Sequence, residues 1–314
     1  MTVFECFLGV DGGGTKTRFA LIDGQGRMLA QAQLGASYHP QVGIDGVRET
    51  LAQGVGQILH DAGVGSDSIR HAFFGIPAHG EDSRITPLLD AIPGAILGHG
   101  RYACDNDMVC GWAGSLGCAD GINIVAGTGS IGYGQRQGAA ARAGGWGEAF
   151  SDEGSAYWIA MQGLNAYSRM SDGRMAKGPL HAHFKQALGL EYDLDLCAQV
   201  YGDHAGSRGE LARLSLLVAQ AAQSGDATAA GIFAQAAREL AQIADTLRRQ
   251  LRFPPGEAVP LSYSGGAFSA GEVLLAPFVA ALQAACPAFE LRAPLHEPHY
   301  GAALYAARLA GRPL

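Results

Sequence analysis

Hydrophobic and polar positions in residues 7–116 follow two periods, one typical of strands and one typical of helices. Short apolar runs separated by turn-forming residues predict three strands within 7–34, with the hairpin turn Asp23-Gly24-Gln25-Gly26 among them. The pattern then predicts a helix over 43–62, a strand over 71–77, a helix over 83–91, a strand from 95–97 to near 104–105, and a helix over 107–116. This order of strands and helices indicates an α/β fold.

The second part of the chain opens with strands again and then becomes strongly helical. Strands are predicted over 122–126 and 130–136, a strand or loop over 140–146, and helices over 154–170, 177–187, 193–202, 207–224 and 226–251. A strand over 259–264, a helix over 271–284, a strand over 288–292 and a helix over 299–310 complete the pattern. We expect one domain over 1–118, joined by the C-terminal helix near 299–314, and a second over 119–298.

A strand followed by a glycine-rich turn and a second strand occurs twice, a domain apart. The first turn is Asp11-Gly12-Gly13-Gly14-Thr15 and the second is Gly127-Thr128-Gly129-Ser130. Without side-chain bulk, backbone N–H groups can approach an anion closely. A plain hairpin is the alternative for either turn, but the repetition favours two halves of one polyphosphate site. The residues expected to bind ATP are Gly12, Gly13, Gly14, Thr15, Lys16, Gly127, Thr128, Gly129 and Ser130.

Acidic residues near these turns indicate the chemistry. Asp11 would be repelled by phosphates unless a divalent cation lay between them, so it predicts Mg²⁺, held largely through water. Asp105 and Asp107 lie where a strand gives way to a helix, the edge at which ligands bind in open α/β sheets. We expect Asp107 to be the general base; the alternatives are capping of the helix, which suits Asp105, or a role for Asp105 as the base.

Two further glycine-rich segments are candidates for ligand contact. The loop Gly144–Ser155 carries three acids and Trp146 before a predicted helix, which suits a sugar because a carboxylate can accept hydrogen bonds from two hydroxyls at once. Capping of that helix is the alternative. Ser264-Gly265-Gly266-Ala267 ends a strand before a helix, which would admit a flat or phosphorylated ligand, or form a plain strand–helix turn.

Composition excludes some partners. The 314-residue chain has a net charge of −7 and no basic run longer than Arg248-Arg249, which argues against a nucleic acid or an anionic membrane. Met1–Cys6 shows no signal-peptide pattern and no apolar stretch reaches roughly 18–20 residues, so we expect a cytoplasmic protein. The six cysteines form no CxxC pair and indicate scattered thiols in a reduced compartment; a metal or iron–sulfur site at Cys104, Cys110 and Cys118 is the alternative.

The order of these motifs resembles the N-acetylglucosamine kinase branch of the BadF/BadG/BcrA/BcrD ATPase family, within the actin/Hsp70/sugar-kinase superfamily. The resemblance covers nearly the whole chain, and Asp152–Trp158 is its most specific part. It implies two ribonuclease-H-like domains hinged around an ATP cleft, with Mg²⁺ at the first turn and Gly265 and Gly266 near adenosine. It also implies that Asp107 activates the sugar 6-hydroxyl. The implied sugar-binding residues are Tyr38, His39, Asp107, Gly145, Trp146 and Asp152.

The expected function is ATP-dependent phosphorylation of N-acetylglucosamine at O6, with glucosamine as the alternative. Tyr38 stands where the family often carries Asn, so the sequence leaves the hexosamine open, along with the preferred nucleotide and any help from Asp105. An iron–sulfur activator of a dehydratase and a non-catalytic sugar sensor are further alternatives. The Ala- and Leu-rich helices within 207–251 could join two subunits in a homodimer or could lie in the core.

Overall fold

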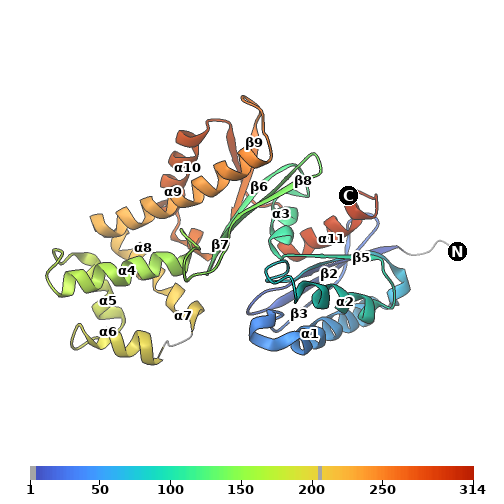
Figure 1. Ribbon diagram of the computed structural model, residues 1–314, viewed down its shortest axis with the longest axis horizontal. Helices are drawn as coiled ribbons and strands as arrows, with labels where there is room; N and C mark the ends of the chain where they lie inside the picture. Colours follow the sequence, from blue (N-terminus) through green and yellow to red (C-terminus); the bar gives the residue numbers. More distant parts are fainter. Residues whose placement is uncertain (1–4, 204–206) are drawn as a thin grey trace. The chain divides into compact units, whose positions relative to one another are not determined.

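The computed structural model describes residues 5–203 and 207–314, and within these ranges the strands form two five-stranded sheets. The chain divides into two compact units, each built around one sheet (Figure 1). Unit 1 extends to Asp120 and includes Ala293–Leu314, and unit 2 is Gly121–Arg292.

The sheet of unit 1 has the strand order β3-β2-β1-β4-β5. The pairs β1–β2 and β2–β3 are antiparallel, whereas β1–β4 and β4–β5 are parallel. A hairpin meander thus continues into crossover connections, which place helices over the sheet. The strands are β1 (Cys6–Asp11), β2 (Thr17–Asp23), β3 (Met28–Leu34), β4 (Ile69–Gly75) and β5 (Tyr102–Asp105).

Helices cover both faces of this sheet. Helices α1 (His39–Ala62) and α2 (Thr86–Leu97) share a buried core with Leu8 and Val10 of β1. Residues between these two point to the opposite face because side chains alternate along a strand. On that side, α11 (Pro298–Leu309) packs against β1, β4 and α3 (Met108–Leu116).

Unit 2 repeats this topology, with the strand order β10-β9-β6-β7-β8. Its antiparallel pairs are again the hairpin strands, β6–β7 and β7–β8, and its parallel pairs are β6–β9 and β9–β10. The strands are β6 (Gly121–Ala126), β7 (Ser130–Arg136), β8 (Ala139–Gly144), β9 (Val259–Ser264) and β10 (Phe289–Arg292).

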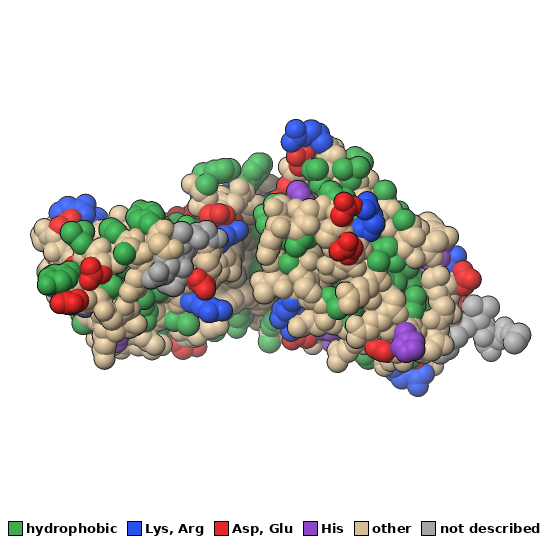
Figure 2. Space-filling view, turned by 90° about the horizontal axis from the view of Figure 1, so that it is seen from below, with side chains coloured by type: hydrophobic (Ala, Val, Ile, Leu, Met, Phe, Trp, Pro, Cys, Tyr) green, Lys and Arg blue, Asp and Glu red, His purple; other side chains and the backbone are tan. Residues whose placement is uncertain are grey.

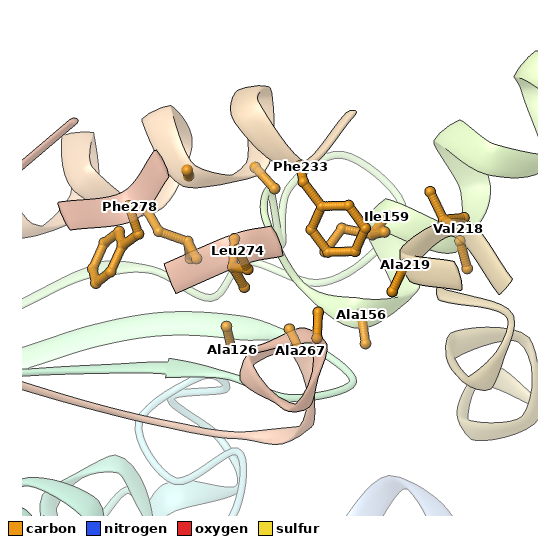
Figure 3. Packing of buried hydrophobic residues seen from close by; sticks show 14 of the residues in the cluster. Ala126, Ala156, Ile159, Val218, Ala219, Phe233, Ala267, Leu274 and Phe278 are labelled. Atoms are coloured by element: carbon orange, nitrogen blue, oxygen red, sulfur yellow. The ribbon is translucent and has the colours of Figure 1, made fainter. Parts of the chain in front are cut away.

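Most of the helix in unit 2 lies between β8 and β9. The helical segments are α4 (Ala156–Ser171), α5 (Pro179–Ala187), α6 (Asp195–Ala198), the π-helical η2 (Gln199–Asp203), α7 (Arg208–Arg213), α8 (Ser215–Gln223), α9 (Ala227–Gln250), the 3₁₀ segment η3 (Gly266–Ala270) and α10 (Glu272–Ala285). Their core joins Phe233 of α9 to Leu274 of α10 (Figure 3). Ala126, Ala156 and Ala267 lie in one row at its edge, where three small side chains bring β6, α4 and η3 close together.

Several predicted elements need correction. Residues 95–97 do not begin a strand; they end α2, whose left-handed C-cap is Gly98. The predicted helix over 207–224 is divided at Leu214 into α7 and α8, and that over 193–202 consists of a short α-helix followed by a π-helix. The apolar spacing continues across these breaks because the residues on both sides of each break are partly buried in the core of unit 2. The buried face of α9 belongs to the unit 2 core, which is the second of the two alternatives for residues 207–251.

The chain returns from unit 2 to unit 1 earlier than the sequence predicts. Residues 293–298 are expected in the second domain but lie in unit 1. The N–H groups of Leu295 and His296 donate to the carbonyls of Ser115 and Gly114, which ties this segment to α3. Among the described residues, no helix is long and apolar enough to cross a membrane. In Figure 2, basic and acidic side chains lie in small mixed groups on the visible face.

Candidate active site

The carboxyl ends of three parallel strands of unit 1 lie level with one another. Asp11 at the end of β1 is in register with Gly75 of β4, and Gly75 with Asp105 of β5. Asp107 follows as the N-cap position of α3, without a side-chain capping hydrogen bond. The sheet thus gathers the three predicted acids at one edge, and the capping alternative for Asp107 loses its support.

Gly75 lets α3 begin close to this edge. A Cβ atom on Gly75 would lie 2.2 Å from the Sγ atom of Cys110 and 3.1 Å from the Cα atom of Asp107. The first distance is shorter than real Cβ contacts and the second is tighter than most of them, so this packing depends on the missing side chain. Sequence reasoning missed Gly75, although its place at the end of a buried apolar strand was visible in the sequence.

The Asp11 carboxyl is electrostatically unusual. Burial raises its pKa to about 8, and the negative charge of Asp107 adds to the increase, while Arg18 and Lys16 oppose it. Two carboxylates this close repel each other unless a proton or a cation lies with one of them. Within the described residues, no three His, Cys, Asp or Glu side chains converge as metal ligands. Asp11 therefore fits Mg²⁺, which keeps several waters and needs few protein carboxylates, rather than a fully protein-ligated metal.

The first glycine turn is partly used by the fold. The Gly12 N–H donates to the Gly75 carbonyl at 2.8 Å, so this predicted phosphate contact is already occupied. Gly13 accepts a hydrogen bond from the Ser37 N–H at 3.1 Å. Gly14, Thr15 and Lys16 are exposed at the tip of the turn. An anion would therefore meet the tip of the turn rather than Gly12.

The predicted sugar segment of unit 1 adjoins this turn. The Thr17 hydroxyl donates to Ser37 Oγ at 2.9 Å, and Ser37 is buried next to Gly12. Tyr38 is the N-cap of α1, and its ring centroid lies 6.3 Å from that of His39. Both rings are half-buried. The structure thus joins Tyr38 and His39 to the Asp11 turn through Ser37, a residue that sequence reasoning had not selected.

The second glycine turn is held by an acid predicted to bind sugar. The Asp152 carboxylate accepts hydrogen bonds from the backbone N–H groups of Ser130 and Gly147 and pairs with Arg208. Only 4% of its side chain is exposed, and burial raises its pKa while these three partners oppose the increase. Asp152 also has a left-handed backbone, with φ of 61°, which is uncommon for a residue other than glycine.

Two predicted phosphate ligands of this turn are engaged in the loop instead. The Ser130 hydroxyl donates to the Glu153 carbonyl at 2.7 Å, and the Gly127 N–H donates to the Gly129 carbonyl at 2.8 Å. A Cβ atom on Gly129 would lie 2.7 Å from both Asp152 Oδ2 and Arg208 Nη2. Thr128 remains exposed at the tip. As in unit 1, the turn presents its tip and uses its base for packing.

The loop of residues 145–155 displays two large aromatic side chains. Trp146 is 73% exposed and Phe150 is 75% exposed, which is unusual for residues of this size. Gly145 has φ of 70° and lies against Ile131, and its carbonyl accepts a hydrogen bond from Arg142 at 2.6 Å. The helix that follows is capped by Ser155, whose Oγ accepts from the Trp158 N–H, so capping does not explain Asp152.

Gly265 brings the end of β9 to the same turn. Its φ is 103°, and a Cβ atom there would lie 2.4 Å from the Ala126 carbonyl carbon and 2.6 Å from the Gly127 nitrogen. Gly265 and Gly266 are both exposed, and Gly266 begins η3. Unit 2 thus gathers three predicted segments, around Gly127, Asp152 and Gly265.

The cysteines do not form the alternative metal site. Cys110 and Cys118 are buried and Cys104 is half-buried, and burial raises the pKa of each thiol, that of Cys118 to about 12. The Cys110 thiol donates to the Val10 carbonyl at 3.4 Å. No metal-ligand group containing these thiols exists among the described residues, so they act as packing groups.

Known proteins resemble this chain along most of its length. Residues 8–306 match the sequence model of the BadF/BadG/BcrA/BcrD ATPase family. N-acetyl-D-glucosamine kinase from Dictyostelium discoideum is 29% identical over 311 residues, which cover 96% of this chain and 98% of that protein. N-acetylmuramic acid/N-acetylglucosamine kinase from Clostridium acetobutylicum is 29% identical over 235 residues, or 74% of this chain and 76% of that protein.

Solved structures agree on the fold. A proposed N-acetylglucosamine kinase from Chromobacterium violaceum has a TM-score of 0.72 and 25% identity, and the match covers 97% of this chain and 99% of that one. A ROK hexokinase from Thermus thermophilus has a TM-score of 0.61 and 18% identity, covering 98% and 99%. The predicted α/β fold of two domains is confirmed, and the ROK likeness concerns the fold alone.

Proposed function

The chain belongs to the BadF/BadG/BcrA/BcrD ATPase family, and we propose that it is an ATP-dependent kinase that phosphorylates O6 of an amino sugar, N-acetylglucosamine first. The observation that carries this proposal is the pairing of Asp11 and Asp107 at the carboxyl edge of the unit 1 sheet. Two acids there can separate two tasks, since one can stay with a cation and the other can accept a proton. Both curated relatives described above are N-acetylglucosamine kinases by name.

In the proposed reaction, Asp107 accepts the proton of the sugar 6-hydroxyl while that oxygen attacks the γ-phosphorus. The bond between the γ-phosphorus and the bridging oxygen breaks, and ADP leaves. Asp11 would hold Mg²⁺ at this edge, and the cation would supply neutralisation of the phosphate charge. Lys16 at the exposed tip of its turn adds a positive charge on the same side. Phosphoryl transfer depends mainly on such positioning and charge neutralisation.

We assign the nucleotide and the sugar to the two glycine turns and their adjoining loops. The tips of the turns, at Gly14-Thr15-Lys16 and Thr128, are proposed to meet the phosphates, because both are exposed while the bases are packed. Gly265 and Gly266 are proposed to lie near adenosine. Trp146 offers an exposed ring for the apolar face of a sugar.

Glucosamine is the second candidate substrate. Tyr38 has a phenol where the family often has the side-chain amide of Asn. The amide oxygen and N–H groups that could bind an N-acetyl group are therefore missing at this position. Glu148, whose side chain is 40% exposed, shares a cation with Asp152 and offers a carboxylate to an ammonium group. These two observations support glucosamine, whereas the names of the relatives support N-acetylglucosamine.

The decisive experiment is a coupled ADP-release assay with N-acetylglucosamine, glucosamine, N-acetylmannosamine and glucose. We expect the highest kcat/KM with one of the first two sugars. ATP binding without turnover on any of the four would instead support the sensor alternative and overturn the proposal.

The assignment of the base has its own test. Asp107→Asn should lower turnover by at least about 10²-fold while ATP still binds, because losing a general base has that scale. Asp105→Asn is the matched control, two residues earlier at the end of β5 and at the same sheet edge. Its carboxylate accepts the Asn106 N–H at 2.7 Å and should matter much less. An inactive Asp105→Asn beside an active Asp107→Asn would reverse the assignment.

A further inference from the structure

We propose that Arg208 is the positioning residue of the sugar-binding loop, and that it acts by holding Asp152 and Glu148 side by side. The inference rests on the proposed function, in which Asp152 binds the sugar. Arg208 was not selected from the sequence. It lies in α7, whereas the loop that it contacts precedes α4.

The geometry is a two-armed clamp. Arg208 Nη2 pairs with Asp152 Oδ2, and Arg208 Nη1 lies 3.2 Å from Glu148 Oε2. Arg208 is the first residue of α7, and α7 packs against α4, the helix that follows the loop. The loop is therefore fixed at both carboxylates from a neighbouring helix.

The clamp limits how Asp152 can receive a sugar. An ionised carboxylate has about four acceptor positions. Ser130 N–H, Gly147 N–H and the Arg208 guanidinium use three of them. One position is left, so Asp152 accepts one sugar hydroxyl, not the two that the sequence suggested. The nearby Glu148 carboxylate, more exposed than Asp152, supplies the second acceptor.

The same geometry argues against a direct role for Arg208 in binding phosphate. Both terminal nitrogens of its guanidinium face carboxylates, so its single positive charge is shared between two negative ones. Its Nε atom is buried and has no hydrogen-bond partner among the described residues. A guanidinium fork suits two carboxylates, whereas a lysine ammonium does not reproduce its geometry.

The test compares three variants of full-length protein by calorimetric titration with N-acetylglucosamine, glucosamine and ADP. Arg208→Met removes the charge and keeps the apolar stem, and Arg208→Lys keeps the charge and removes the fork. Arg213→Met is the matched control, an exposed arginine at the far end of the same helix. We expect Arg208→Met to weaken binding of the preferred sugar at least about tenfold and Arg208→Lys to recover only part of it. ADP affinity should stay within about twofold of the wild type.

A combined variant separates positioning from general destabilisation. Because Arg208 acts through both Asp152 and Glu148, Arg208→Met added to Asp152→Asn/Glu148→Gln should weaken sugar binding little beyond the two carboxylate substitutions alone. Full additivity, or an equal loss of sugar and ADP affinity in Arg208→Met, overturns the inference.

A second measurement keeps the inference independent of the substrate. If wild-type protein binds neither sugar, the proposed function fails, and amide hydrogen exchange of residues 144–155 still decides the role of Arg208. Faster exchange of this loop in Arg208→Met than in Arg213→Met supports the clamp. Equal exchange in the two variants overturns it.

Discussion

Replacing Gly75 by alanine tests whether the start of α3 determines catalysis. The added methyl carbon would lie 2.2 Å from Cys110 Sγ, whereas ordinary contacts begin near 3.4 Å, so one of the two atoms must move by more than 1 Å. Cys110 is buried and stands one helical turn after Asp107. A shift of α3 that relieves the overlap therefore carries Asp107 with it.

The expected cost has two parts. Overpacking a core typically costs about 1–3 kcal/mol, which corresponds to a decrease in Tm of about 2–5 °C for a chain of this size. A displacement of about 1 Å at a catalytic group can cost about 10²-fold in turnover. We expect Gly75→Ala to lower kcat by about that factor. The ATP dissociation constant should change little, because the proposed nucleotide contacts lie elsewhere, whereas sugar binding should weaken as Asp107 moves away from the 6-hydroxyl.

A compensating variant makes the reasoning refutable. Cys110→Ala removes the Sγ atom that the methyl group would strike, so Gly75→Ala/Cys110→Ala should recover most of the Tm and part of kcat. The remaining loss should reflect the contact of 3.1 Å to the Asp107 Cα atom. Wild-type kcat and Tm in Gly75→Ala alone would refute the argument, and so would a double variant no better than the single one. Cys110→Ala by itself is the control for the loss of the thiol.

Three other outcomes follow from the same structure. Gly129→Ala should disturb the loop and weaken sugar binding, because its methyl group would meet two charged groups at 2.7 Å, whereas Gly127→Ala meets no atom within 4 Å; equal effects in titration would contradict this. Asp11→Ala should raise the Mg²⁺ concentration needed for turnover, and an unchanged Mg²⁺ titration would remove its metal role. Asp193 accepts hydrogen bonds from Ser171, His181 and two lysines, which lower its pKa. A group whose pKa is lowered by folding stabilises the folded protein above about pH 4, and this stabilisation is lost as the pH falls. Asp193→Asn should therefore lower Tm at pH 7 and make Tm fall less steeply as the solution is acidified.

The strand ends were predictable from the sequence, and the loop contacts were not. Asp11 ends one strand and Asp107 follows another, and parallel strands align their carboxyl ends, so a pattern of residues was enough to place them at one edge. The glycine-rich loop was enough to select Asp152 as a candidate, but its partner Arg208 lies 56 residues further on in a short helix. No local periodicity links those two positions. The same holds for Gly75, whose importance depends on a thiol that only the packed helix brings close.

The repeated topology of the two sheets does not extend to the residue that precedes each glycine turn. Two similar glycine turns suggested two similar phosphate cradles, yet the residue before the first turn is the half-buried Asp11 and the residue before the second is Ala126, buried in the core. Strand β6 therefore ends without a carboxylate, and in unit 2 the acid arrives from the later loop, through Asp152. A duplicated backbone thus does not duplicate the chemistry.

The two units hold their acids by different physical means. In unit 1 the backbone hydrogen bonds of a five-stranded sheet fix Asp11, and changes in a loop cannot shift it much. In unit 2 the position of Asp152 depends on side-chain contacts and a left-handed backbone, which one substitution can alter. Within the proposed function, we therefore expect chemistry that requires a constant geometry at the sheet edge of unit 1, and recognition of a particular sugar at the loop of unit 2. On this reasoning, substitutions in residues 145–150 should change which amino sugar is preferred while leaving the dependence on Asp107 intact.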